Sequence, residues 1–161
     1  MKLTCEHTIN NFSKDNTPIM TITAPVTMTI ETKDCYSNML RSPEPRDQRV
    51  PSELINPATG PIYIEGAEPG DTLKVTIERI DIEDFGVVSC GDDCGPLAKF
   101  INGSHLEILN IKDGHIDFLG KYKIPIHKMI GVIGVAPADD ALRTSYPGRH
   151  GGNMDTNMIT E

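Results

Sequence analysis

The sequence contains no tryptophan, and only 5% of its 161 residues are aromatic. Its core must therefore be built from aliphatic side chains, and the short runs of isoleucine and valine favour strands over helices. Cations are also scarce: 15 Lys and Arg stand against 23 Asp and Glu, which gives a formal net charge of −8. This excess of negative charge argues against nucleic acid or an anionic membrane surface as a partner.

Long apolar runs are absent as well. No stretch approaches the ~20 apolar residues that a membrane helix requires, and the N-terminal segment Met1–His7 lacks the apolar core of a secretory signal. We therefore expect a cytoplasmic protein with no membrane partner. The length predicts a single β-rich domain over residues 1–161, large enough to bury a sizeable core.

Cysteine is sparse, with four residues at Cys5, Cys35, Cys90 and Cys94. A disulfide framework is not expected in a cytoplasmic chain of this size. Cys90 and Cys94 flank an acidic turn, and no second pair follows at the spacing of a structural zinc site. We interpret them as ordinary thiols.

What the chain does contain is a series of short alternating runs separated by turn signals. Residues 18–23 and 26–32 alternate apolar residues with threonine, as strands with one buried face do, and Pro25 separates them. Asp113-Gly114 lies between alternating runs at 104–111 and 115–126 and predicts a β-hairpin.

Two further runs predict strands of different kinds. After a type II turn at Pro69-Gly70, residues 72–84 alternate, with a slip at Glu78-Arg79 that predicts a β-bulge. Residues 129–135 form a continuous apolar run that contains Gly131 and Gly134. That pattern predicts a buried strand whose glycines allow another backbone to approach closely.

Functional side chains gather in the glycine motif, which we define as Tyr146–Asp155. It combines three glycines, a proline, a cation, an imidazole, an amide and a carboxylate in ten positions. Glycine and proline are unfavourable inside regular elements, so the composition predicts a loop whose backbone approaches a ligand closely. A glycine-rich surface turn without a function remains the alternative.

Two stretches resemble a known family. The sequence YPGRHGGNMDTNMI, which contains the whole glycine motif, and NPATGPIYIEGAEPGDTLKVTI at Asn56–Ile77 are similar to the acetamidase/formamidase family of amide hydrolases. The resemblance covers most of the chain, but only about the first half of the family's usual length. The family's second half, with its Gly-Asp-x-His and Gly-Asp-Gly-Glu segments, has no counterpart here.

The resemblance implies an amidase, a hydrolase that converts a small aliphatic amide such as formamide or acetamide to a carboxylate and ammonia. Amide hydrolysis needs an activated nucleophile, a stabilised oxyanion and a proton for the leaving nitrogen. No serine or cysteine nucleophile motif is legible in the sequence. Metal-assisted hydrolysis remains, in which a bound water has its pKa lowered to about 7.

On this interpretation His150 and Asp155 are the candidate metal-binding residues, and the cofactor is a divalent metal such as zinc. One histidine and one aspartate do not complete a coordination shell. The family resemblance implies that the other ligands come from a complementary C-terminal half or a second subunit.

Four more residues of the glycine motif are candidate catalytic groups. Asn153 would orient a ligand or donate to the amide carbonyl, and Arg149 would stabilise negative charge. The backbone N–H groups of Gly151 and Gly152 would contribute to an oxyanion site.

The short strands, the hairpin and the turn signals together predict an all-β fold: sandwich-like antiparallel sheets with long irregular loops, incomplete without a complementary second half. Sheet edges left without a partner pair readily with other chains, so we expect an oligomer or a hetero-complex. Two alternatives stay open. One is a non-catalytic β-domain that oligomerises or binds a metal or small ligand, and the other is an unrelated β-rich binding module.

Overall fold

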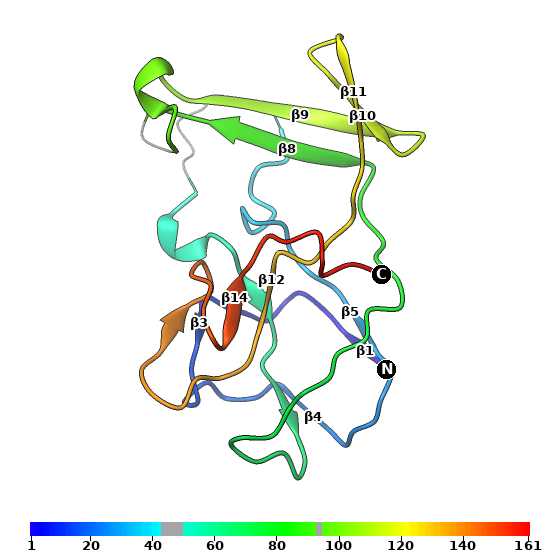
Figure 1. Cartoon of the computed structure of the whole chain (residues 1–161), viewed down its shortest axis with the longest axis vertical. Helices are drawn as coiled ribbons and strands as arrows, with labels where there is room; N and C mark the ends of the chain where they lie inside the picture. The colour runs from blue at the N-terminus through cyan, green and yellow to red at the C-terminus, as the bar shows by residue number, and fades with distance from the viewer. Residues whose placement is uncertain (43–49, 93–94) are drawn as a thin grey trace.

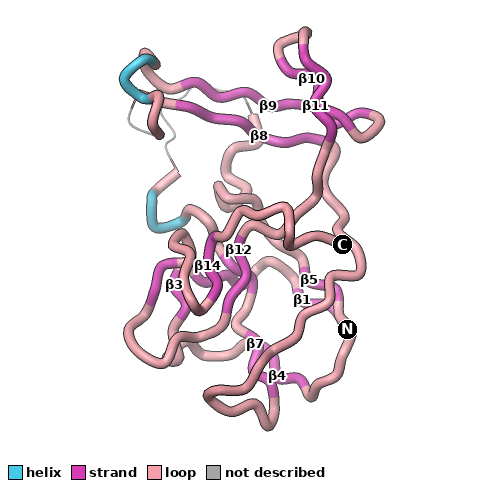
Figure 2. The backbone as a smooth tube through the Cα atoms, in the orientation of Figure 1, coloured by secondary structure: helices cyan, strands magenta, loops and turns pink. Residues whose placement is uncertain are grey.

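The structure, a computed structural model, describes residues 1–42, 50–92 and 95–161, so Cys94 lies outside the described residues. The predicted all-β class is confirmed, because short strands joined by long irregular segments dominate the chain (Figure 2). In the described ranges the only helical elements are two single 3-10 turns, η1 at Ser52–Leu54 and η2 at Ala98–Phe100. None of the helices in this part of the chain is long and apolar enough to cross a membrane.

The described residues form fourteen strands, most of them only two to four residues long. In chain order they are β1 (Lys2–Leu3), β2 (Thr8–Ile9), β3 (Asn11–Phe12), β4 (Met20–Ile22), β5 (Thr29–Ile30), β6 (Ala58–Thr59), β7 (Ile62–Ile64), β8 (Phe85–Cys90), β9 (His105–Lys112), β10 (His115–Phe118), β11 (Tyr122–Pro125), β12 (Val132–Gly134), β13 (Leu142–Arg143) and β14 (Gly151–Asn153).

The strands β4 and β5 confirm the two predicted N-terminal strands, with Pro25 in the break between them. They do not pair with each other. β4 pairs in parallel with β7, and β5 pairs in parallel with β1, whereas the other strand pairs are antiparallel. Parallel partners must come from distant parts of the sequence, so an alternating pattern alone does not predict them.

The largest sheet has four antiparallel strands in the order β11-β10-β9-β8 and lies at one end of the molecule (Figure 1). The predicted hairpin is confirmed: Lys112 pairs with His115, and Asp113 and Gly114 between them have φ angles of 51° and 73°. Positive φ at both turn residues is the geometry whose twist matches the paired strands.

The second arm of that hairpin is not one strand, as the pattern at 115–126 predicts, but two. Leu119 and Gly120 adopt φ angles of 56° and 64°, so the chain reverses and β11 returns along β10. Phe118 pairs with Tyr122 across this turn. The glycine inside the alternating run was the available signal for the turn.

The predicted strand and bulge at 72–84 are wrong. No β-ladder involves residues 72–83 among the described residues, although the turn before them is formed, with the Asp71 N–H donating to the Glu68 carbonyl at 3.0 Å and Gly70 at φ 103°. Alternation shows which side chains would share a face of a strand. It does not supply the neighbouring strand that a ladder needs.

The buried core of the described residues is small. Its apolar members are Leu3, Phe12, Ile80 and Leu109, each no more than 9% exposed. Thr144 is fully buried at 0% exposure, and its backbone N–H donates to the Asn10 carbonyl at 3.0 Å. In Figure 1, β3, β12 and β14 lie together in the part of the molecule away from the four-stranded sheet, and they position the glycine motif.

Candidate active site

A short two-stranded ladder organises the glycine motif. β12 and β14 are antiparallel, and Gly134 lies opposite Gly151. The predicted close approach at Gly134 is confirmed, because a methyl group placed there would lie 2.7 Å from the His150 carbonyl oxygen. The prediction of a loop throughout the motif is wrong for Gly151–Asn153, which form β14: glycine faces glycine in the ladder, so two backbones fit where side chains would separate them.

The glycines of β14 are required by this local geometry. Gly151 and Gly152 have φ angles of 101° and 94°, which side-chain-bearing residues rarely adopt. A methyl group on Gly151 would lie 2.2 Å from the Ile133 carbonyl oxygen, and one on Gly152 would lie 2.1 Å from the Tyr146 carbonyl oxygen. The glycine pair therefore has a structural role that is independent of any chemistry.

A tight turn precedes β14 and presents Arg149 and His150. Gly148 and Gly151 exchange backbone hydrogen bonds of 2.8 and 3.0 Å, so Arg149 and His150 form the tip of a two-residue turn. The two side chains then diverge. Arg149 is exposed, whereas His150 is only 8% exposed.

His150 packs against the core through its ring. Its centroid lies 5.4 Å from that of Phe12 in β3, and the two planes meet at 65°, an edge-to-face contact. The Nε2 atom of His150 is buried and has no hydrogen-bond partner among the described residues. A buried polar atom without a partner costs about 1–3 kcal/mol, and an imidazole nitrogen is a preferred ligand of divalent metals. His150 therefore fits the predicted role of metal ligand.

Asn153 and Asp155 place their oxygens over Gly131, just before β12. A methyl group on Gly131 would lie 2.7 Å from Asp155 Oδ1 and 3.6 Å from Asn153 Oδ1. The Gly131 carbonyl also accepts from the Met154 and Asp155 N–H groups at 2.8 and 3.3 Å. This explains the first glycine of the apolar run at 129–135, because a side chain at Gly131 would displace the Asp155 carboxylate.

The loop at Asp34–Asn38 lies near Asp155, which sequence reasoning did not anticipate. The pKa of the Cys35 thiol is raised, first by partial shielding of its sulfur from water and then by the negative charges of Asp34 and Asp155. The residue as a whole is still exposed to solvent. Only the proline-rich and charged composition of residues 34–60 hinted that this excursion reaches a functional region.

Asp34 itself is occupied by turn chemistry. Its Oδ1 accepts from the backbone N–H groups of Tyr36 and Asn38 at 2.9 and 2.8 Å, and its own N–H donates to Asn38 Oδ1 at 2.9 Å. Ser37 and Asn38 have positive φ angles of 55° and 59°. The Cys35 carbonyl accepts the Asn56 N–H at 2.8 Å, which ties this loop to the start of the family-like stretch at Asn56–Ile77.

The described residues do not form a complete metal site. They contain no group of three or more His, Cys, Asp or Glu side chains that could hold an ion. His150 lies against Gly148 and Gly152, while Asp155 lies against Gly131. Zinc sites in proteins take three or four protein ligands, so His150 and Asp155 alone would not complete such a shell.

The predicted oxyanion donors are engaged within the fold. The Gly151 N–H donates to the Gly148 carbonyl at 3.0 Å, so this hydrogen bond would have to open before Gly151 could bind an oxyanion. Gly152 lies opposite Ile133 in the ladder. Arg149 makes no hydrogen bond or ion pair with the rest of the described chain. The catalytic roles of these three residues stay predictions.

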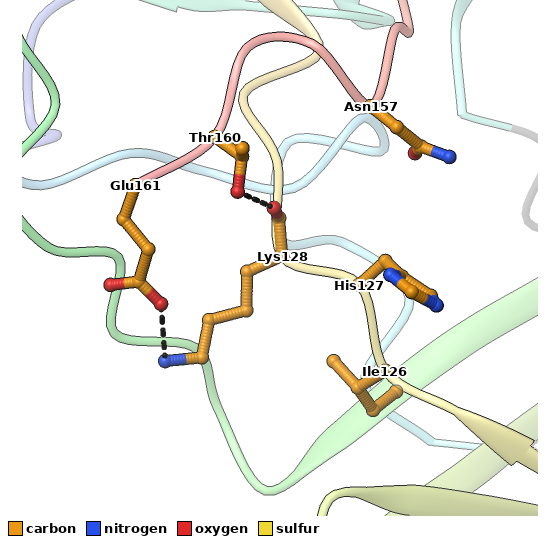
Figure 3. A pocket seen from close by; sticks show the side chains of 6 residues that line it. All are labelled: Ile126, His127, Lys128, Asn157, Thr160 and Glu161. Atoms are coloured by element: carbon orange, nitrogen blue, oxygen red, sulfur yellow. Dashed lines mark hydrogen bonds and ion pairs between the residues drawn. The ribbon is translucent and has the colours of Figure 1, made fainter.

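A surface pocket lies between the segment that follows β11 and the C-terminal residues (Figure 3). None of the predicted site residues lines it. Its walls are Ile126, His127, Lys128, Asn157, Thr160 and Glu161.

Solved structures closely match this fold. A recombinant predicted acetamidase/formamidase from Thermoanaerobacter tengcongensis superposes with a TM-score of 0.93 at 41% identity, over 99% of this chain and 53% of that chain. An acetamidase from Bacillus halodurans gives a TM-score of 0.93 at 34% identity, over 99% of this chain and 54% of that chain. An acetamidase from Yersinia enterocolitica, 23% identical, shares the fold with a TM-score of 0.71, over 99% of this chain and 54% of that chain.

This chain therefore spans about half the length of these relatives, as their coverage of 53% and 54% shows. No curated protein matches the sequence. The model of the Acetamidase/Formamidase family matches residues 2–145, which is most of the chain and ends just before the glycine motif. The resemblance stated from the sequence is thus confirmed, and the chain belongs to the acetamidase/formamidase family.

Proposed function

We propose that this chain supplies the N-terminal half of an amidohydrolase that cleaves small aliphatic amides such as formamide and acetamide to a carboxylate and ammonia. The observation that carries the proposal is the likeness to two solved family members, an acetamidase among them, at 34% and 41% identity over 99% of the chain. Those proteins are almost twice as long as this chain. The activity is therefore proposed for the assembly of both halves.

The proposed chemistry is metal-assisted hydrolysis. When bound, a divalent metal such as zinc supplies a water whose pKa is lowered to about 7 and polarises the amide carbonyl. Of this chain's residues, His150 would bind through its buried Nε2, and Asp155 would bind through its exposed carboxylate. The remaining ligands would come from the complementary C-terminal half or from a second subunit, because the described residues contain no third ligand nearby.

The other residues of the glycine motif would act on the substrate. Asn153, whose Oδ1 lies on the same side of Gly131 as the Asp155 carboxylate, would orient the amide or a ligand. Arg149 is exposed, so it is free to approach negative charge that develops on the carbonyl oxygen. Phe12 packs against the His150 ring and would hold its orientation.

A reconstitution assay tests this function. The probe is the part of the Thermoanaerobacter tengcongensis relative that this chain does not cover, produced as a separate polypeptide and mixed with this chain and zinc. Ammonia release from formamide and acetamide is measured for each polypeptide alone and for the mixture. We expect activity only in the mixture, and we expect His150→Ala and Asp155→Asn to reduce it to background.

Asp117→Asn on β10 is the matched control, because it removes an exposed carboxylate far along the chain from the glycine motif. It should leave the rate unchanged. A mixture that hydrolyses neither amide while its two halves associate would favour the alternative, a non-catalytic β-domain that oligomerises or binds a metal or small ligand. Full activity in both glycine-motif variants would remove His150 and Asp155 from the mechanism.

A further inference from the structure

Residues 72–83, which we call the open segment, follow a drawn-out course (Figure 1) but belong to no sheet among the described residues. Figure 1 shows this segment, in green, running along one side of the molecule from the turn after β7, past the N terminus, to the start of β8. Three of its apolar side chains are exposed: Leu73 by 50%, Val75 by 54% and Ile82 by 46%. Burying side chains of this kind is the main source of stability in proteins, so their exposure requires an explanation.

The backbone of the open segment is also unpaired. Among the described residues, no backbone–backbone hydrogen bond involves positions 72–83, and only Ile80 has its N–H and carbonyl bonded to side chains. An extended run of free N–H and C=O groups is a template for a neighbouring strand.

The side chains of the open segment divide between two faces. In a strand, Leu73, Val75 and Ile77 would share one face, because successive residues of a strand point to opposite sides. Between them, Lys74 and Thr76 share the opposite, polar face. One apolar face and one polar face are typical of a strand in a sheet that is buried on a single side.

The far end of the open segment is held in place. Ile80 is 8% exposed; its N–H donates to Glu161 Oε2 at 3.1 Å, and its carbonyl accepts from Lys128 Nζ at 2.6 Å. Lys128 and Glu161 also form an ion pair at 3.4 Å, which Figure 3 shows together with the bond from Thr160 to the Lys128 carbonyl. This anchoring restricts the path of the segment before a partner binds, so less conformational entropy is lost on binding.

We infer that the open segment pairs with a β-strand of the polypeptide that corresponds to the second half of the family. The choice of partner rests on the proposed function and on the share of the relatives that this chain leaves uncovered, since it spans 53% and 54% of their length while matching 99% of its own. The partner strand forms backbone hydrogen bonds along residues 72–79, and apolar side chains of the partner cover Leu73 and Val75. The open segment is thus the contact that joins the two halves of the enzyme.

Binding, and not activity, tests this contact. The probe is again the uncovered part of the Thermoanaerobacter tengcongensis relative, co-expressed with this chain, and the dissociation constant of the complex is measured. Val75→Asp places a charge on the apolar face, and Thr76→Asp places the same charge on the polar face one residue away. We expect at least tenfold weaker binding for Val75→Asp and a change of less than threefold for Thr76→Asp.

Amide hydrogen exchange gives a second measurement that needs no variant. In the chain alone, amides 72–79 should exchange rapidly, and in the complex alternate amides should become protected as a new ladder forms. Two results would overturn the inference. If the halves bind but Val75→Asp does not weaken binding and the amides of the open segment are not protected, the contact is elsewhere and the proposed amidase stands. If the segment becomes protected by a second copy of this chain and the probe does not bind, the partner and the two-half enzyme both fail.

Discussion

Alanine at Gly152 tests whether the backbone itself constrains the glycine motif. Gly152 has a φ angle of 94°, and a methyl group there would lie 2.1 Å from the Tyr146 carbonyl oxygen. The unfavourable φ costs roughly 1–3 kcal/mol in a residue other than glycine, and relieving the overlap by backbone movement costs about 1–3 kcal/mol more. We therefore expect Gly152→Ala to lower the free energy of unfolding by roughly 2–6 kcal/mol.

Two matched controls separate these contributions. Gly66 has a φ angle of 78° but nothing within 4 Å of an added methyl group, so Gly66→Ala measures the cost of the backbone conformation alone. Gly86 in β8 has neither a positive φ nor a close neighbour, so Gly86→Ala should change stability little. Urea unfolding followed by far-ultraviolet circular dichroism gives all three values.

The order expected is Gly152→Ala most destabilising, Gly66→Ala intermediate and Gly86→Ala smallest. A Gly152 variant no less stable than the Gly66 variant would refute the close approach of β14 to the Tyr146 backbone. The glycine motif would then be a loose surface turn, and its side chains would not be held in defined positions.

Four further predictions rest on contacts in the structure. The pKa of the Cys35 thiol is raised in the folded chain. Alkylation of this thiol should therefore reach half its maximal rate at a higher pH than alkylation of an ordinary cysteine does. Asp155→Asn should lower this midpoint pH because it removes a negative charge. Because the pKa of Cys35 is higher in the folded chain than in the unfolded chain, the stability that this thiol confers is present at low pH and declines as the pH rises toward the folded pKa. The free energy of unfolding of Cys35→Ser should therefore fall less at alkaline pH than that of the unchanged chain. Phe12→Ala should lower the free energy of unfolding by about 3–5 kcal/mol, because this ring is only 5% exposed. A smaller loss in urea unfolding would mean that neighbouring residues collapse into the space left by the ring. Lys128→Met should speed hydrogen exchange around Ile80, whose carbonyl loses its donor, and unchanged exchange would show that the anchor does not hold the open segment.

Local sequence patterns predicted the local structure well. Asp113-Gly114 specified a hairpin because both residues tolerate the positive φ that the turn requires. Gly134 indicated a close backbone approach because only glycine leaves room for it. In both cases the information lies in the geometry of one or two residues, so no distant partner had to be known.

The rest depends on contacts between residues far apart in the chain. The alternation at 72–84 predicted a strand, but a strand needs a neighbour, and no described segment provides one. The packing of Phe12 on His150 and the approach of the Cys35 loop to Asp155 join residues more than a hundred positions apart. No periodicity reports such pairs, so the sequence predicted the members of the glycine motif but not their surroundings.

The central proposal is that this chain supplies one half of an amidase whose metal site is completed by a complementary C-terminal half or a second subunit. Native mass spectrometry of the protein purified gently from its own host tests it most directly. We predict a complex that contains this 161-residue chain, a second chain of similar size and residual mass for a divalent metal ion. A metal-free assembly made of this chain alone would contradict the claim.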